Sequence, residues 1–419
     1  MSLVDLQCAL TPQEQSLVDV QTHYPANTSY IRAVAVEFLV AHQKEALMAV
    51  MLHLHETQGN LRAYLDHDKK TVLKTLDCPV TWVDGSAMTM DELAIQYDAF
   101  KSKPFDLAQP PLYRVQLTQL ANNRCLLWFA ASHLIMDGMA IAGILRRIAQ
   151  HLHQNKHTPC DLKVIEQSAD YFSIDSLRRL FVSSIKSLQQ QLLVQDWTAL
   201  FIEKQAIDVP DYHAHTADFV VELPKQLAFD KGAKGQPYDI NAYVLSMVQL
   251  TIASTCDSSG FLLKVMNHQR QERWLLHYLG FVASGFLMPV QLQEATMESC
   301  YEHNPQWLSK SDHVPITAFD SCMLPPVNIC YNFFGSMFSE KRFTDRMKLT
   351  FLTNTKHHMW CDSVKLSVDV YIVDGGYLRI SLSALSQYVS EAMLTAFKDQ
   401  LQSLLPCKRQ TSHSPAKLS

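Results

Sequence analysis

The sequence predicts an α/β protein built from two halves, each containing mixed β-sheets rather than a strict alternation of strand and helix. The chain has 419 residues, which is long enough for two domains. Apolar residues make up 47% and charged residues 18%, a composition typical of globular proteins with large cores. Short apolar or alternating runs are interspersed with helical patterns along the whole chain, which favours α+β mixed sheets over a Rossmann fold.

The first half opens with a helix signal, Thr11 followed by Pro12 and Glu14. Asn122 and Asn123 supply a turn between two strands, so we expect a hairpin that ends at His133. The expected elements are a helix at 11–23, a strand at 29–40, a helix at 43–57, strands at 61–65 and 71–75, a helix at 90–103, and strands at 112–117 and 125–131.

Residues 155–170 are polar and irregular and mark the expected domain boundary. We expect domains at 1–170 and 171–405, with a disordered tail at 406–419. The second half is expected to hold a long helix at 174–206, a strand at 218–223, a loop at 232–237, a helix at 239–253 capped by Asp239, strands at 261–266, 286–292, 327–333, 364–373 and 377–382, and a helix at 390–405.

Charge and hydropathy exclude several classes of protein. The net charge is −5 and no stripe of Lys or Arg occurs, which argues against nucleic-acid binding. No run of about 18 apolar residues occurs, so no membrane span is expected. The N-terminus lacks a basic region followed by an apolar stretch, so we expect a cytoplasmic protein.

Cysteine and histidine spacing gives no sign of a metal. The ten cysteines form no Cys-x-x-Cys pair, which favours reduced thiols over disulfides or zinc. The pairs His151/His153 and His213/His215 have no cysteine or carboxylate at ligand spacing. The sequence also lacks a glycine-rich phosphate loop and a Gly-x-Ser-x-Gly motif. We therefore expect no metal and no permanently bound cofactor.

The segment His133-Leu134-Ile135-Met136-Asp137-Gly138 is the strongest indication of chemistry. It follows an apolar strand and precedes a helical pattern, which places the histidine on a turn at a strand end. A neutral imidazole there can accept a proton from an amine or hydroxyl that attacks a carbonyl. A lone histidine is more often packed or surface-exposed, so the wider pattern decides its role.

That pattern resembles the condensation-domain superfamily of acyltransferases, which includes nonribosomal peptide condensation domains and chloramphenicol acetyltransferase-like enzymes. The resemblance covers roughly residues 10–405. It is carried by His133-x-x-x-Asp137-Gly138, by Phe105-Asp106-Leu107-x-x-x-Pro111-Leu112-Tyr113-Arg114, by strand 126–131, by Arg270 ten residues before Gly280, by the segment 327–335, and by the closing elements at 369–405.

The resemblance implies two chloramphenicol acetyltransferase-like subdomains in a V-shaped pseudo-dimer with a central tunnel. It implies that His133 is the catalytic residue, and that Asp137 pairs with Arg270 to hold the turn. Gly138 would let the helix start close to the strand or present a backbone N–H. Three further residues are expected to line the tunnel: Ser132, Ser284 and Asn332.

Three departures from the family pattern bear on the chemistry. Ser132 stands where condensation enzymes usually have a first histidine. The family's Gly-x-Phe-Val-Asn-Thr segment reads Gly280-Phe281-Val282-Ala283-Ser284-Gly285. The Asp-Phe-Gly-Trp-Gly motif of the plant-type CoA acyltransferases is absent, which disfavours that branch.

The function implied is transfer of an acyl group from a thioester to an amine or hydroxyl acceptor. The donor would be a carrier-protein phosphopantetheine arm supplied in trans, or a CoA thioester. A carrier would require a basic patch, for which Arg146-Arg147 and Arg178-Arg179 are the candidates. The alternatives are a CoA-dependent O- or N-acyltransferase acting on a small molecule and an inactive binding module of the same fold.

Overall fold

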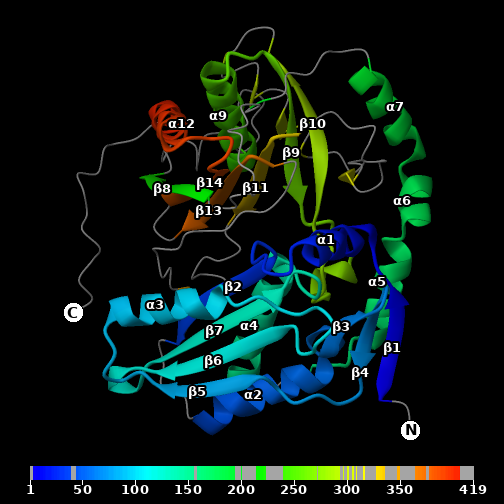
Figure 1. Ribbon diagram of the computed structural model, residues 1–419, viewed down its shortest axis with the longest axis vertical. Helices are drawn as coiled ribbons and strands as arrows, with labels where there is room; N and C mark the ends of the chain where they lie inside the picture. Colours follow the sequence, from blue (N-terminus) through cyan, green and yellow to red (C-terminus); the bar gives the residue numbers. More distant parts are fainter. Residues whose placement is uncertain are drawn as a thin grey trace.

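The computed structural model describes residues 3–38, 44–154, 158–193, 200, 214–222, 239–270, 272–292, 296, 300–301, 304–305, 308, 315–316, 327–335, 347–349, 364–373 and 377–405. Figure 1 shows two lobes, one above the other, each with a β-sheet and helices packed against it. The loop expected at 232–237 and the tail expected at 406–419 lie outside the described residues.

The first lobe contains the N-terminal elements of the chain. Its helices are α1 (Pro12–His23), α2 (Lys44–Thr57), α3 (Met90–Lys101) and α4 (Gly138–Gln154). Its strands are β1 (Val4–Ala9), β2 (Ile31–Phe38), β3 (Ala63–Asp66), β4 (Lys69–Leu73), β5 (Val80–Asp84), β6 (Tyr113–Gln119) and β7 (Cys125–Ser132). Three helices follow, α5 (Leu162–Tyr171), α6 (Ile174–Leu180) and α7 (Val182–Leu193), and α6 and α7 run along one side of the molecule (Figure 1).

The second lobe is built from the C-terminal elements. Its helices α9 (Ile240–Thr255) and α12 (Glu391–Leu404) lie side by side on one face of a sheet (Figure 1). The strands are β8 (Ala214–Glu222), β9 (Gly260–Asn267), β10 (Ser284–Gln291), β11 (Ile329–Gly335), β13 (Leu366–Val373) and β14 (Tyr377–Leu385). This six-stranded sheet has the order β10-β9-β11-β13-β14-β8 and mixes parallel and antiparallel pairs.

The first lobe has a five-stranded sheet of order β12-β2-β7-β6-β5 and a three-stranded sheet of order β1-β4-β3. Strand β12 (Met347–Leu349) comes from the second half of the chain and pairs antiparallel with the edge of β2. The two halves are therefore joined by backbone hydrogen bonds as well as by side chains. The mixed α/β class predicted from the sequence is confirmed.

Most predicted elements lie close to their observed positions. Thr11 and Glu14 form a capping box at the start of α1, and Asp239 caps α9 through the backbone N–H groups of Asn241 and Ala242. The hairpin of β6 and β7 is present, and Asn122 and Asn123 both have positive φ values, 60° and 58°. Asparagine tolerates this conformation better than most residues, which is why the pair predicted the turn.

Three expectations were wrong. Residues 162–171 form α5, although 155–170 were expected to be irregular; its apolar residue Ile165 packs into the first core. The single helix expected at 174–206 is broken at Phe181, because α6 ends at Leu180 and α7 begins at Val182. Strands β1 and β5 were missed because both are short and only partly buried, so their apolar pattern is weak.

Each lobe has its own apolar core, and one segment crosses between them. Leu275, Tyr278, Leu279 and Val282 follow β9 in the chain but belong to the core of the first lobe. A Cβ atom at Gly143 of α4 would lie 2.5 Å from Leu279 Cδ2, so this glycine admits the close approach. Within the described ranges, no helix combines the length and apolar character that crossing a bilayer requires.

Candidate active site

The turn that carries the histidine begins at the end of the most buried strand of the first lobe. All eight residues of β7 are buried. Ser132 ends the strand, and its hydroxyl accepts a hydrogen bond from the backbone N–H of Leu134 at 3.3 Å. Its backbone N–H donates to Leu112 at 2.8 Å. Ser132 thus shapes the turn, and it is itself 2% exposed.

His133 lies in this turn and is only 8% exposed. Its backbone N–H donates to the carbonyl of Tyr30 at 2.7 Å, and its ring packs against the ring of Phe281 with 4.2 Å between centroids. Burial lowers the pKa of His133 to about 3; the positive charge of Arg32 acts in the same direction and Asp137 opposes it. The imidazole is therefore neutral at physiological pH, and its buried Nδ1 atom has no hydrogen-bond partner among the described residues.

Asp137 caps the helix that follows. Its Oδ1 atom accepts from the backbone N–H of Ala140 at 2.8 Å, and α4 starts at the next residue, Gly138. Its Oδ2 atom accepts from the backbone N–H groups of Val282 and Ala283, both at 3.1 Å. The same carboxylate therefore stabilises a helix start in one lobe and a turn from the other half of the chain.

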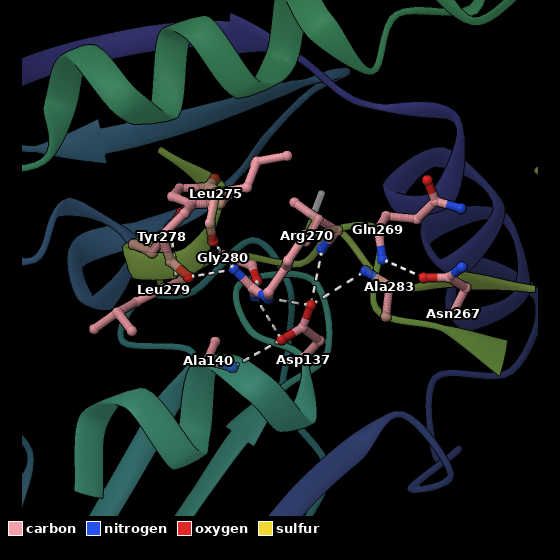
Figure 2. Close-up of polar contacts among 12 residues, drawn as sticks. Asp137, Ala140, Asn267, Gln269, Arg270, Leu275, Tyr278, Leu279, Gly280 and Ala283 are labelled. Atoms are coloured by element: carbon pink, nitrogen blue, oxygen red, sulfur yellow. Dashed lines mark hydrogen bonds and ion pairs between the residues drawn. The ribbon is translucent and has the colours of Figure 1, made fainter. Parts of the chain in front are cut away.

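The strongest partner of Asp137 is Arg270, whose Nη2 atom lies 2.8 Å from Oδ1 and 3.0 Å from Oδ2 (Figure 2). One nitrogen serves both oxygens, so the contact is not the parallel two-nitrogen fork that such pairs often form. Burial by itself would raise the pKa of Asp137, but the Arg270 guanidinium and the N–H groups of Ala140 and Val282 outweigh it and lower that pKa. Asp137 is therefore ionised at neutral pH.

Arg270 also holds the segment that crosses into the first lobe. Its Nη1 atom donates to the carbonyls of Leu275 and Tyr278 at 2.7 and 2.6 Å, and Nη2 donates to that of Gly280 at 3.1 Å (Figure 2). Gln269, just before it, has φ 53°, and the Asn267 side chain accepts from its backbone N–H at 2.9 Å. This tight turn sets the direction in which Arg270 leaves β9.

The other residues expected at the site are spread around this centre. A Cβ atom at Gly138 would lie 3.5 Å from the Phe334 ring, so the start of α4 contacts β11 of the second lobe. Ser284 is buried at the start of β10, and its hydroxyl donates to the carbonyl of Gly285 at 3.3 Å. Asn332 is on β11 and pairs in register with Asp369 of β13.

Two charged residues, Arg32 and Asp369, were not identified from the sequence. Arg32, on β2, is close enough to lower the pKa of both His133 and Asp369. Asp369 was noted only as part of a closing strand. The available signal was a charge inside an alternating apolar strand, Leu366-Ser-Val-Asp-Val-Tyr371, where one face is buried and the other is free to carry chemistry.

The basic pairs expected to serve a carrier protein are partly engaged in structural contacts. Arg147 contacts Gln58 through Nη1 and donates to the carbonyl of His277 at 2.8 Å, so it joins α4 to the crossing segment. Arg179 donates to the Asp175 carbonyl and the Ser176 hydroxyl of its own helix. Within the described residues, no cluster of three or more His, Cys, Asp or Glu side chains could hold a metal ion; His213 lies outside them.

Comparison with known proteins identifies this architecture. Residues 7–176, which include His133 and Asp137, match the family model of the condensation domain. The chain superposes on the epimerization domain from the third module of tyrocidine synthetase B with a TM-score of 0.76 and 16% identity, covering 96% of both chains. The chain therefore has the fold of these domains, and its residues 7–176 are similar to the condensation-domain family.

Two further structures share the fold of this chain. One is a double mutant of the starter condensation domain of rhizomide synthetase in complex with C8-CoA and Leu-SNAC, with a TM-score of 0.76 and 14% identity over 95% of this chain and 94% of that one. The other is the first condensation domain of the calcium-dependent antibiotic synthetase in complex with a substrate analogue, with a TM-score of 0.75 and 13% identity over 96% of both chains.

Curated relatives match this chain only in part. A linear gramicidin synthase polypeptide of Brevibacillus parabrevis is 28% identical over 135 residues, which is 30% of this chain. A plipastatin synthase polypeptide of Bacillus subtilis (strain 168) is 37% identical over 57 residues, which is 14% of this chain. The chain covers only 3% and 2% of the lengths of these two synthase polypeptides.

Proposed function

We propose that this protein is a condensation-type acyltransferase of natural-product biosynthesis. It would join an acyl group, delivered as a thioester, to an amine or hydroxyl acceptor, forming an amide or an ester. The observation that carries the proposal is His133, a buried neutral imidazole at a strand end whose turn is held by the Asp137–Arg270 pair. Condensation-domain structures of the same fold with CoA-linked or substrate-analogue ligands support it.

The low pKa of His133 restricts its role. A base with a pKa of about 3 removes a proton poorly from a resting amine or alcohol, because efficiency falls as the base weakens. It can still accept a hydrogen bond from the acceptor and direct the nucleophile toward the thioester carbon. Proton loss then follows bond formation, because attack makes the nucleophile strongly acidic. His133 therefore acts first as an orienting group and second as a relay.

The reaction proceeds through attack at the thioester carbonyl. The nitrogen or oxygen of the acceptor forms a bond to the carbonyl carbon, and the carbon–sulfur bond then breaks. The proton lost by the acceptor ends on the departing sulfur, which leaves as a free thiol. No redox step occurs. Holding both reactants in line can supply a large part of the rate, about 7–11 kcal/mol in favourable cases.

Asp137 and Arg270 would position the site rather than take part in the chemistry. Both groups are charged and engaged in short hydrogen bonds to each other and to backbone atoms through the Asp137 oxygens and the two Nη atoms of Arg270. The buried Nε–H of Arg270 has no hydrogen-bond partner among the described residues, and the rest of the pair is engaged. Its effect is to fix the turn at residues 133–137 against the segment at 275–283.

The donor would be a CoA thioester or an acyl group on a carrier-protein phosphopantetheine arm. Both present the same thioester and the same pantetheine chain, so the site chemistry does not distinguish them. Because Arg147 already contacts Gln58 and His277, it is a weaker candidate for carrier docking than its sequence position indicated. Arg146 remains the candidate to test.

The test uses octanoyl-CoA and octanoyl-carrier protein as donors, with Leu-SNAC as an amine acceptor and product detection by mass spectrometry. We expect N-octanoyl-Leu-SNAC from the wild-type chain and a loss of about 100-fold or more in His133→Ala. His23→Ala, a change at an exposed histidine of α1, is the matched control and should retain activity. Unchanged turnover in His133→Ala would disprove the assigned role. No product across a panel of donors and acceptors would favour a non-catalytic binding module.

A second candidate is epimerization of an aminoacyl thioester, since the tyrocidine epimerization domain superposes as well as the rhizomide condensation domain does. Removal of a proton from carbon needs a stronger base than a histidine with a pKa of about 3, which disfavours it. Leu-SNAC deuterated at Cα decides the matter, because loss of deuterium without acyl transfer would indicate epimerization.

A further inference from the structure

Phe281 is the residue of the crossing segment that contacts the histidine of the catalytic turn. The centroids of the Phe281 and His133 rings are 4.2 Å apart, and the ring planes are tilted by 50°. The two residues come from different halves of the chain, because Phe281 lies between β9 and β10 whereas His133 follows β7. The histidine is 8% exposed, and Phe281 is half-buried. Removal of the aromatic ring would therefore open the imidazole to water.

The backbone on both sides of Phe281 is bound to the Asp137–Arg270 pair. Before it, the carbonyl of Gly280 accepts a hydrogen bond from Arg270 Nη2 at 3.1 Å (Figure 2). After it, the backbone N–H of Val282 donates to Asp137 Oδ2 at 3.1 Å. Val282 is itself 1% exposed and belongs to the core of the first lobe. The ion pair therefore fixes the place from which the Phe281 side chain reaches the histidine.

Gly280 gives the chain room to make this approach. A Cβ atom at Gly280 would overlap the ring of Tyr278, so a larger residue there would displace one or the other. Tyr278 is 3% exposed and lies in the core of the first lobe. Two aromatic residues three positions apart thus have different contacts. Tyr278 anchors the segment in the core, and Phe281 packs on the histidine.

The charged groups around His133 come from other parts of the structure. Arg32, on β2, lowers the pKa of His133, and Asp137, in the same turn, raises it. Arg270 reaches the turn through its contact with Asp137. His268 follows β9, and the charges of Asp137 and Arg270 act on its pKa. All four side chains stay in place when an apolar neighbour of the imidazole is changed.

We propose that Phe281 is a positioning residue for acyl transfer, whose ring holds the His133 imidazole against its turn and keeps water away from it. The inference rests on the acyl-transfer function proposed above and adds a residue to its site. Residues 280–283 carry no ionisable side chain, so this part of the crossing segment acts by contact and by exclusion of water. A shielded imidazole stays neutral in mildly acidic solution, and only a neutral imidazole can accept a hydrogen bond from the acceptor.

The first measurement is the titration of His133 in the full chain, by NMR of histidine-labelled protein from about pH 7.5 to about 4.5, a range that spans the ordinary titration of histidine. The His133→Ala variant assigns its signal among the 18 histidines. We expect the wild-type imidazole to stay neutral throughout. In Phe281→Ala we expect a pKa above about 5, because burial is the largest cause of the wild-type shift. Phe281→Leu, which keeps apolar bulk, should give a smaller rise.

Trp274→Leu is the matched control. Trp274 lies in the same connection between β9 and β10, and its ring packs edge-on against Tyr171 with 5.7 Å between centroids. This variant also removes an aromatic ring that packs on the first lobe. It should leave the titration of His133 unchanged.

Acyl transfer from octanoyl-CoA to Leu-SNAC gives a second measurement. The ratio of kcat/KM in a variant to kcat/KM in the wild type cancels the titration of the acceptor amine. For Phe281→Ala we expect this ratio to be about twofold or more lower near pH 5 than near pH 7.5, since a protonated imidazole cannot accept a hydrogen bond. For Trp274→Leu the ratio should not change with pH.

Two outcomes would overturn the inference. One is a His133 imidazole that stays neutral over the whole range in Phe281→Ala, or in Phe281→Leu if the alanine variant does not fold. The other is a wild-type imidazole that titrates near the ordinary value of about 6.5, because it would then have no shield. The NMR titration needs no turnover, so it separates this inference from the proposed function. Absence of acyl transfer in the wild type would reject the function, and a raised pKa in Phe281→Ala would still support the shielding.

Discussion

Asp137 and Arg270 are 133 residues apart in the sequence, and their side chains meet at 2.8 Å in the interior of the protein. The side chain of Arg270 is 4% exposed and that of Asp137 is 1% exposed. Each also binds backbone atoms of the segment at 275–283, so the pair joins a helix start, a strand end and a crossing loop. The catalytic turn is therefore held by the second half of the chain.

Removing the carboxylate should destabilise the fold strongly. Asp137→Ala leaves the Arg270 guanidinium buried without its counter-charge and removes the cap of α4. We expect a loss of about 3–5 kcal/mol in the free energy of unfolding, measured by urea denaturation. Asp218→Ala breaks a more exposed ion pair and should cost about 1 kcal/mol or less. Equal losses in the two variants would contradict a special role for Asp137.

Arg270→Lys tests whether geometry or charge matters at this position. Lysine keeps the charge, but its single ammonium cannot reach Asp137 and the carbonyls of Leu275, Tyr278 and Gly280 together. We expect a loss of about 2 kcal/mol in stability and an equal or larger relative loss of acyl transfer, since the segment beside His133 loosens. Wild-type stability in this variant would show that a positive charge alone suffices.

Stability should fall as the pH is lowered, in part because of His133. Its pKa is about 3 in the folded protein and close to the ordinary 6.5 in the unfolded chain. At pH values between these two, the unfolded chain binds the proton more readily than the folded protein does. This group therefore makes the free energy of unfolding decrease as the pH falls from about 6.5 toward 3. His133→Ala should lessen the difference in stability between pH 7 and pH 4 by a few kcal/mol. An unchanged pH dependence in His133→Ala would contradict this assignment.

Asp369 should have the opposite effect. Its pKa is raised to about 6 in the folded protein from an ordinary value of 3.8, so the folded chain binds the proton more readily between these values. The contribution of protonated Asp369 to the stability of the folded protein is fully present below pH 3.8 and is lost as the pH rises through 6. We expect Asp369→Asn to raise stability at pH 8 by on the order of 1 kcal/mol, and to have little effect at pH 4. A variant less stable than the wild type at pH 8 would indicate that the ionised carboxylate is paired.

The local elements could be predicted because their signals are local. Thr11 with Glu14 and Asp239 with its following N–H groups are caps defined within four residues of sequence. The alternation of β13 and β14 likewise indicates which side chains are buried. The break at Phe181 and the strand β1 depend on packing partners remote in the chain, so no local pattern reveals them.

The candidate site was predicted only in part. His133 and Asp137 share a short motif, and Arg270 could be identified by its spacing from Gly280. Arg32 and Asp369 belong to strands from different halves of the chain, and neither stands in a motif. The effect of Arg32 on both His133 and Asp369 follows from how the two sheets are arranged, with β12 completing the sheet of the first lobe.

The sequence by itself determined the mixed α/β class, the strand-turn-helix around His133, and the pairing partner expected for Asp137. These depend on side-chain period, capping chemistry and a spacing of charges that can be read along the chain. Tertiary structure alone decided that His133 is buried enough to remain neutral, that one nitrogen of Arg270 serves both oxygens of Asp137, and that Arg32 acts on both His133 and Asp369. Burial and through-space charge depend on which segments are brought together by folding, and that is a property of the packed molecule.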